Sequence, residues 1–237
     1  TMRVTYVGHS TFKLDSNTGI SLIIDPWIKN NPVSYIDIDS LTDLTAVLVT
    51  HGGYDHVADA PYLAKKNWCP LLCDPATWTN LYNCNFPNEL IEGCVTGIRR
   101  SYNDWEVKVL DAKHPSMYRD SSLIGPAISY LISIDEQNIY HMGDTSISAE
   151  HKMYAELYDP SVVLVPIGEG GDYFPELYPD EAALVVKWLD PQVAIPMHYP
   201  AGSDRRAIFN EKCEELKVNK NTKIVNLEPG DSFEFDR

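Results

Sequence analysis

One short stretch carries three side chains that can bind a metal ion, THGGYDHVADA at Thr50–Ala60. It follows the apolar run Ala46–Val49, which is typical of a buried strand. Two imidazoles and a carboxylate (His51, Asp55 and His56) therefore come where a buried strand ends, and they lose hydration there unless a cation or hydrogen bonds compensate. We predict a metal site at this stretch, within which Gly53 offers no ligand.

Three more potential ligands follow other apolar strands. His114 comes after the alternating segment Trp105–Leu110, Asp144 after Asn138–His141, and His198 after the apolar segment 193–196. An α/β fold builds a site in this way when it lines up the ends of its strands along one edge. A hydrolytic site with two metal ions needs about seven such ligands, mixed imidazoles and carboxylates. The strand ends therefore predict one shared site.

The remaining pattern alternates strands with helices and contains no flexible linker, so a single α/β domain over residues 1–237 is expected. Pro179–Leu189 is the clearest helix, because Asp180 and Glu181 occupy its first turn and Pro191 follows its end. The other expected helices are 58–66, 75–82, 150–157 and 205–217. The other expected strands are 2–14 with a break at Gly8–Ser10, 21–25, 70–73, 127–134, 162–166 and a final pair within 223–235 around the Pro229–Asp231 turn.

Composition restricts the partners and the compartment. The chain has 19 Lys and Arg against 34 Asp and Glu, a formal net charge of −15. Such a charge repels nucleic acid and anionic membranes, so neither is expected as a partner. Neither a signal peptide nor a membrane anchor is expected. The five cysteines lack a regular spacing, so we expect reduced thiols in a cytoplasmic protein.

Taken in order, these motifs make the chain similar to the metallo-β-lactamase superfamily of metal-dependent hydrolases, and within it to the branch of L-ascorbate-6-phosphate lactonase. The resemblance covers nearly the whole chain and implies a four-layer αβ/βα metallo-β-lactamase sandwich. Its marks are GHSTF, LIIDPW at Leu22–Trp27, THGGYDH, LDAKH ending at His114, YHMGDT at Tyr140–Thr145, VLVPIG at Val163–Gly168, IPMHY at Ile195–Tyr199 and EPGDSF.

The resemblance also implies which residues bind metal. The first ion would take His51, the residue at position 53, and His114. The second would take Asp55, His56 and His198, with Asp144 bridging the two ions. The family motif is H-x-H-x-D-H, and this chain departs from it because position 53 is glycine. The second set is therefore complete, whereas the first lacks one ligand and is expected to bind its ion more weakly.

Further residues are candidates for supporting roles. Tyr54 or Glu169 could supply the oxygen that Gly53 lacks, and either would favour iron or manganese. The resemblance places His9 close to the site without making it a ligand, and Asp25 is expected to hold a metal-bound histidine by a hydrogen bond. Tyr173 and Tyr199 are candidates for contacting the substrate. His141 is expected to be structural, and His151 to be an exposed helix residue.

The resulting expectation is a hydrolase in which a metal-bound hydroxide attacks a small ester, lactone or phosphoester. Asp55 or Asp144 would orient the water and receive its proton. The cofactor is one or two divalent ions, with zinc expected and manganese or iron as alternatives; homo-oligomers stay an open option. Two other functions compete: a non-hydrolytic mononuclear metalloenzyme, for example one that uses iron, and a catalytically silent metal-binding protein.

Overall fold

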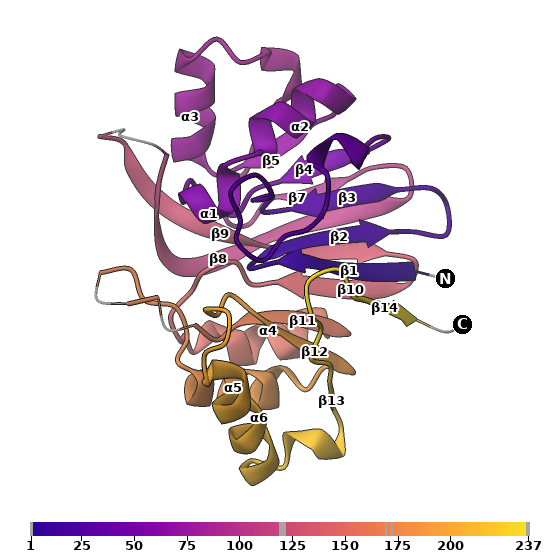
Figure 1. Ribbon diagram of the computed structural model, residues 1–237. Helices are drawn as coiled ribbons and strands as arrows, with labels where there is room; N and C mark the ends of the chain where they lie inside the picture. The colour runs from indigo at the N-terminus through magenta and orange to yellow at the C-terminus, as the bar shows by residue number, and fades with distance from the viewer. Residues whose placement is uncertain (1, 119–121, 169, 172, 236–237) are drawn as a thin grey trace. The chain divides into compact units, whose positions relative to one another are not determined.

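The computed structural model describes residues 2–118, 122–168, 170–171 and 173–235 (Figure 1). The chain divides into two compact units, and each is described by itself. The first comprises residues 1–98, 115–128 and 227–237, and the second comprises 99–114 and 129–226. The expectation of one domain stays a prediction.

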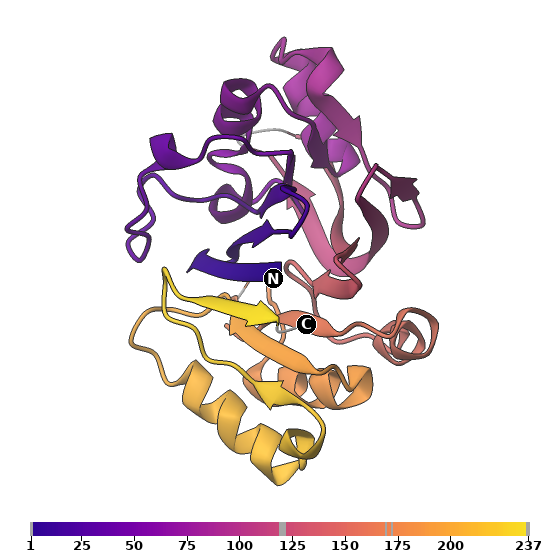
Figure 2. The same cartoon turned by 90° about the vertical axis from the view of Figure 1, so that its right-hand side faces the viewer.

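The sheet of the first unit has an antiparallel half and a parallel half. Strand order is β14-β1-β2-β3-β4-β5-β6, antiparallel from β14 to β3 and parallel from β3 to β6. Figure 2 shows the yellow β14 beside the indigo β1, so distant parts of the sequence pair at one edge. The strands are β1 (Met2–Gly8), β2 (Thr11–Asp15), β3 (Ser21–Ile24), β4 (Ala46–Leu48), β5 (Leu71–Cys73), β6 (Ile91–Gly93) and β14 (Ser232–Phe235).

Short helices cover the parallel half of this sheet. Apolar side chains of β4 and β5, such as Val47 and Leu71, form one core with Leu63 and Leu81 of the helices. The start of α3 follows directly from its sequence, because the Asp74 side chain accepts a hydrogen bond from the Thr77 backbone N–H. The helical segments are α1 (Tyr54–Val57), α2 (Ala60–Asn67), α3 (Pro75–Asn83), η1 (Ile38–Ser40) and η2 (Asn88–Leu90).

The second sheet is also mixed, with order β13-β12-β11-β10-β9-β8-β7. Strands β10 to β13 are parallel, whereas β9 is antiparallel to β10 and β7 is antiparallel to β8. The ends of β8 and β9 that lie within 115–128 belong to the first unit. The strands are β7 (Arg99–Ser101), β8 (Trp105–Met117), β9 (Ile124–Ile134), β10 (Gln137–His141), β11 (Val162–Pro166), β12 (Val193–Met197) and β13 (Lys223–Ile224).

Helices α4, α5 and α6 gather beside β11 and β12 in Figure 1. Helix α5 buries Ala182, Val185, Val186 and Leu189, a spacing that lines one helical face, against the apolar side chains of β11 and β12. Its N-terminus is fixed by Glu181, whose carboxylate accepts from the Tyr178 backbone N–H at 3.0 Å. The helical segments are α4 (Glu150–Tyr158), α5 (Pro179–Leu189), α6 (Arg205–Glu215) and η3 (Val218–Lys220).

The α/β class and most element positions agree with the sequence prediction, including both bounds of α5. The expected final hairpin is wrong, because β13 pairs with β12 and β14 pairs with β1 in the other sheet. Strand β8 runs on to Met117, so His114 lies inside a strand instead of after one. Over the described ranges, no helix has both the length and the hydropathy that crossing a bilayer requires.

Candidate metal centre

In the first unit, the predicted ligands lie on the loop after β4 and on α1. His51 and His56 are buried, at 3% and 0% exposure, and their ring centroids are 4.1 Å apart. Gly53 is the residue before the first turn of α1, and this turn carries Asp55 and His56. A tight turn between strand and helix thus presents two imidazoles and a carboxylate together.

A single buried carboxylate, that of Asp25, organises this group. It accepts from the Thr50 backbone N–H, from the Thr50 hydroxyl and from His56 Nδ1, each at 2.7 Å. The Thr50 hydroxyl, which donates to Asp25, in turn accepts from Nδ1 of His51 at 3.1 Å. Asp25 follows β3 with a φ of 48°, a costly conformation for a non-glycine residue. Asp25 thus hydrogen-bonds a predicted metal ligand, and its support of a metal-bound histidine stays a prediction.

The Asp55 carboxylate is oriented by His9. His9 Nε2 lies 2.8 Å from Asp55 Oδ2, a hydrogen bond, whereas His56 Nε2 lies 3.4 Å from the same oxygen. Asp55 is the more accessible carboxylate of this group, with its side chain 34% exposed. His9 therefore contacts a predicted ligand, as a supporting residue would.

The side of Gly53 that would carry a Cβ faces the predicted ligands. A Cβ built there would lie 2.7 Å from His51 Nε2 and 3.2 Å from Asp55 Oδ1. The missing side chain therefore points to the metal-binding atoms of this group, and the His51 imidazole occupies part of the space it would need. Any other residue at position 53 requires the His51 ring to move.

In the second unit, Asp144 lies beside two imidazoles. Its Oδ2 is 3.6 Å from His114 Nε2 and 3.2 Å from His198 Nε2, and all three side chains are largely buried. Asp144 comes shortly after β10, and His198 follows β12 directly. His198 itself has a φ of 55°, so this predicted ligand, like Asp25, has a strained backbone conformation.

The remaining nitrogens of these imidazoles face oxygen atoms. His114 Nδ1 donates to the backbone carbonyl of Pro175 at 3.3 Å, and His198 Nδ1 lies 3.4 Å from Glu176 Oε2. Glu176 is only 4% exposed, and one ligand atom each of Asp144, Glu176 and His198 lie within 4.8 Å of one another. Sequence reasoning missed Glu176, because it lies in an irregular segment before α5 where no periodicity marks it.

Gly170 is the one sequence signal that accompanies Glu176. Its φ is 63°, and a Cβ at this position would lie 2.6 Å from both carboxylate oxygens of Glu176. Only glycine fits this close approach without displacing the carboxylate. The absence of a side chain at Gly170 therefore leaves room for the buried Glu176 carboxylate next to His198.

The two groups share a geometry that fits a divalent metal ion. Two ligand atoms about 2.1 Å from a tetrahedral ion lie about 3.4 Å apart. The three Nε2-to-carboxylate distances within the units are 3.4, 3.6 and 3.2 Å. All four imidazoles meanwhile direct Nδ1 to an oxygen atom, which is how metal-bound histidines are oriented. The residues present therefore fit the implied cofactor.

The tyrosines predicted to contact the substrate or support the site are all at least partly exposed. Tyr54 opens α1 and is 62% exposed, and Tyr173 is 86% exposed. Tyr199 is half-buried, and its hydroxyl lies 3.5 Å from Arg206 Nη1. Glu169 lies outside the described residues, so its role stays a prediction.

Two other histidines lie outside both groups. His141 is fully buried at the end of β10 and accepts from the Gly143 backbone N–H, which agrees with a structural role. The expected exposure of His151 is wrong, since it is 1% exposed. His151 and Tyr154 form the buried face of α4, and burial lowers the pKa of His151 to about 4. The i, i+3 spacing of these two residues could have revealed that face.

Comparison with known proteins identifies the family of this chain. Residues 3–198 match the sequence profile of the beta-lactamase superfamily domain. UPF0173 metal-dependent hydrolases from Methanobrevibacter smithii and Methanopyrus kandleri are each 34% identical to this chain; the first alignment covers 99% of this chain and 98% of the relative, the second 98% and 100%.

A solved structure is similar over the same span. Igni18, described as a novel metallo hydrolase from the hyperthermophilic archaeon Ignicoccus hospitalis, superposes with a TM-score of 0.81 at 29% identity and covers 99% of both chains. The expected α/β metallo-β-lactamase fold is thereby confirmed. The chain belongs to the beta-lactamase superfamily and, within it, to the UPF0173 metal-dependent hydrolase family.

Proposed function

We propose that this protein hydrolyses a small ester, lactone or phosphoester with the help of bound divalent metal, and that both groups of ligands hold metal. The observation that supports this most directly is the shared imidazole geometry: Nδ1 is directed to an oxygen atom and Nε2 faces a carboxylate at 3.2 to 3.6 Å in three of four cases. The resemblance to the lactonase branch favours a cyclic ester, with or without a phosphate, as the first substrate to test.

The chemistry divides between the ion and the chain. A bound divalent ion lowers the pKa of water from about 15.7 to about 7, which supplies hydroxide at neutral pH. Asp55 is suited to hold the proton that the water releases: Oδ2 is fixed by His9, and Oδ1 lies on the side of Gly53 that carries no side chain. Asp25 keeps His56 in one orientation and one tautomer through its hydrogen bond to Nδ1. In the second unit, Asp144 is the carboxylate that would take the role of Asp55.

The test combines metal analysis with turnover. Purified protein is loaded with zinc, manganese or iron(II), its bound metal is counted, and panels of lactones, esters and phosphodiesters are screened. We expect turnover with at least one panel, and we expect the His56→Ala variant to lose metal and at least a hundredfold of the activity, about the loss typical of a removed catalytic group. His151→Asn is the matched control, since His151 is a buried histidine outside both groups. Equal activity in His56→Ala and wild type would refute the proposal.

A second function is favoured by one observation, the buried carboxylate of Glu176 beside Asp144 and His198. In this alternative Glu176 binds the ion itself instead of orienting His198, and two carboxylates with one imidazole suit iron or manganese better than zinc. A non-hydrolytic iron enzyme would show oxygen consumption in the iron-loaded protein and no turnover of the hydrolase panels. Hydrolysis with zinc and no oxygen consumption would exclude it.

A further inference from the structure

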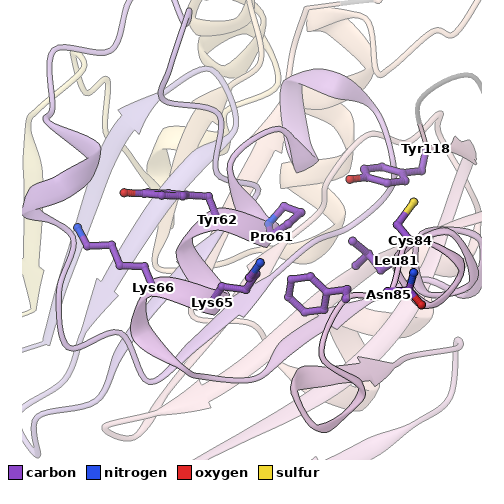
Figure 3. A pocket seen from close by; sticks show the side chains of 9 residues that line it. Pro61, Tyr62, Lys65, Lys66, Leu81, Cys84, Asn85 and Tyr118 are labelled. Carbon is purple, nitrogen blue, oxygen red and sulfur yellow. The ribbon is translucent and has the colours of Figure 1, made fainter.

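A pocket in the first unit lies between α2, the end of α3 and Tyr118 (Figure 3). Its volume is about 670 Å³, within the range of about 300 to 1,000 Å³ that holds small-molecule ligands. Helix α2 contributes Pro61, Tyr62, Lys65 and Lys66, and the second wall is formed by Leu81, Cys84, Asn85 and Phe86. None of the predicted metal ligands lines it, so it is a feature distinct from the metal-binding groups.

The floor of this pocket is apolar and firmly packed. Leu81, Phe86 and Tyr118 are 2%, 8% and 5% exposed, and all three belong to the hydrophobic core of the first unit. Buried core side chains keep their positions, so the pocket does not need to form around a ligand. An aromatic or branched apolar group placed here would cover surface that otherwise faces water.

The charges around the pocket are one-sided. Among the described residues that line it there are two lysines and no aspartate or glutamate, although the chain carries a net charge of −15. Lys66 is already engaged, because its Nζ donates to the Asp39 carbonyl oxygen at 2.6 Å, and the Tyr62 hydroxyl donates to the Asp39 carboxylate at 2.6 Å. The Lys65 ammonium group, in contrast, has no hydrogen-bond or ion-pair partner in the described part of the chain.

Figure 3 shows the same division. The Tyr62 hydroxyl and the Lys66 ammonium group point away from Cys84 and Tyr118, whereas the Lys65 side chain does not extend to that side with them. The hydroxyl end of Tyr118 points from the opposite wall toward Pro61. A lysine in the last turn of a helix also offsets the helix dipole, and Lys65 has that position in α2. The dipole explains a lysine there, but it does not explain the apolar hollow beside it.

We propose that this pocket binds a small molecule with an aromatic or branched apolar body and one singly charged anionic group. The apolar body lies on Leu81, Phe86 and Tyr118, and the anionic group lies beside the Lys65 ammonium. A single charge fits because one of the two lysines is neutralised by Asp39. Carboxylates and sulfonates meet this description, whereas a phosphate dianion would leave one charge uncompensated in an acidic protein.

Cys84 provides a reporter at the rim of this pocket. It is exposed, whereas Cys69, Cys73, Cys94 and Cys213 are buried. Burial also raises the pKa of Cys69 to about 11 and that of Cys213 to about 12, which keeps these thiols unreactive. Alkylation of the folded protein by N-ethylmaleimide should therefore occur at Cys84, and a ligand in the pocket should slow it.

The test uses two fluorescent probes that differ by one charge. 8-Anilinonaphthalene-1-sulfonate has an aromatic body with a sulfonate, and N-phenyl-1-naphthylamine is the same body without it. Both are titrated into wild type, Lys65→Gln and Lys220→Gln; Lys220 is exposed on η3 of the second unit and controls for the change in net charge. Cys84 alkylation is followed by mass spectrometry with and without saturating probe.

We expect Lys65→Gln to weaken binding of the sulfonate about fivefold to tenfold, the range for a charged partner in a partly exposed site, and to leave the uncharged probe unchanged. Lys220→Gln should change neither, and bound sulfonate should protect Cys84. The proposal is overturned if both lysine variants weaken the sulfonate equally, or if Cys84 is alkylated at the same rate with the probe bound. Neither readout requires turnover or metal, so the result is independent of the proposed hydrolase activity.

Discussion

The two groups of predicted ligands are built in different ways. In the first unit, His51, Asp55 and His56 lie on one continuous loop and turn, and a single carboxylate, Asp25, holds the loop and His56. In the second unit, His114, Asp144 and His198 come from three distant parts of the chain. There the supporting oxygens are the Pro175 carbonyl and the Glu176 carboxylate.

This difference shows what fixes the positions of the ligand side chains in each group. The first group depends on the hydrogen bonds to one carboxylate, since Asp25 accepts three of them in a fully buried position. The second depends on strand register: β10, β11 and β12 are parallel, with His141 opposite Leu164 and Pro166 opposite Met197. Asp144 and His198 then follow the ends of β10 and β12, which both pair with β11. Loss of the Asp25 carboxylate should therefore disrupt the first group more than loss of any single supporting residue disrupts the second.

The largest effect is expected from Asp25→Asn. The amide keeps the shape of the carboxylate, but it removes the charge and leaves an NH₂ group facing donors. We expect the free energy of unfolding of the metal-free protein to fall by about 3 kcal/mol, as when a buried charged hydrogen-bond centre loses its acceptor. Urea denaturation measures this. Asp43→Asn, an exposed site, should change stability by less than about 0.5 kcal/mol.

The same comparison explains what the sequence could predict. The first group is local, so the spacing of His51, Asp55 and His56 and the acidic residue before Pro26 were enough to propose it. Asp144 and His198 were found because they follow apolar strands. Glu176 was missed because its position depends on the close approach of Gly170, which is a tertiary contact.

Other differences also arise from tertiary structure. A final hairpin was expected because a Pro-Gly-Asp turn separates two strand-like segments, but β13 and β14 find better partners in separate sheets. His151 is predicted to be an exposed helix residue, yet α4 turns that side toward the core. Local patterns fix the type of an element more reliably than its partner.

A smaller effect is expected from Glu176→Gln. If Glu176 orients His198 for metal binding, the variant should retain its metal-free stability and lose about tenfold in metal affinity, at the low end for an outer carboxylate. Competition with a chelator measures the affinity, and urea denaturation measures the stability. Glu156→Gln, on the exposed side of α4, is the matched control. Equal affinity in the two variants would show that Glu176 has no part in holding metal.

A small effect on stability is also expected at Gly53. Its φ of −54° and ψ of 137° are open to alanine, so Gly53→Ala should change the free energy of unfolding by less than about 1 kcal/mol. The added Cβ meets His51 Nε2 at 2.7 Å, however, so the His51 ring must rotate and metal affinity should fall. Chelator competition on metal-loaded protein measures that loss.

Gly53→His separates the two explanations for this glycine. It brings the same Cβ and adds an imidazole that points to the metal-binding atoms of the first group. If glycine marks a missing ligand, Gly53→His should bind metal more tightly than Gly53→Ala and raise the bound metal per chain. If both variants lose affinity equally, glycine is required there so that the His51 ring can take its place, and the first group works with two imidazoles.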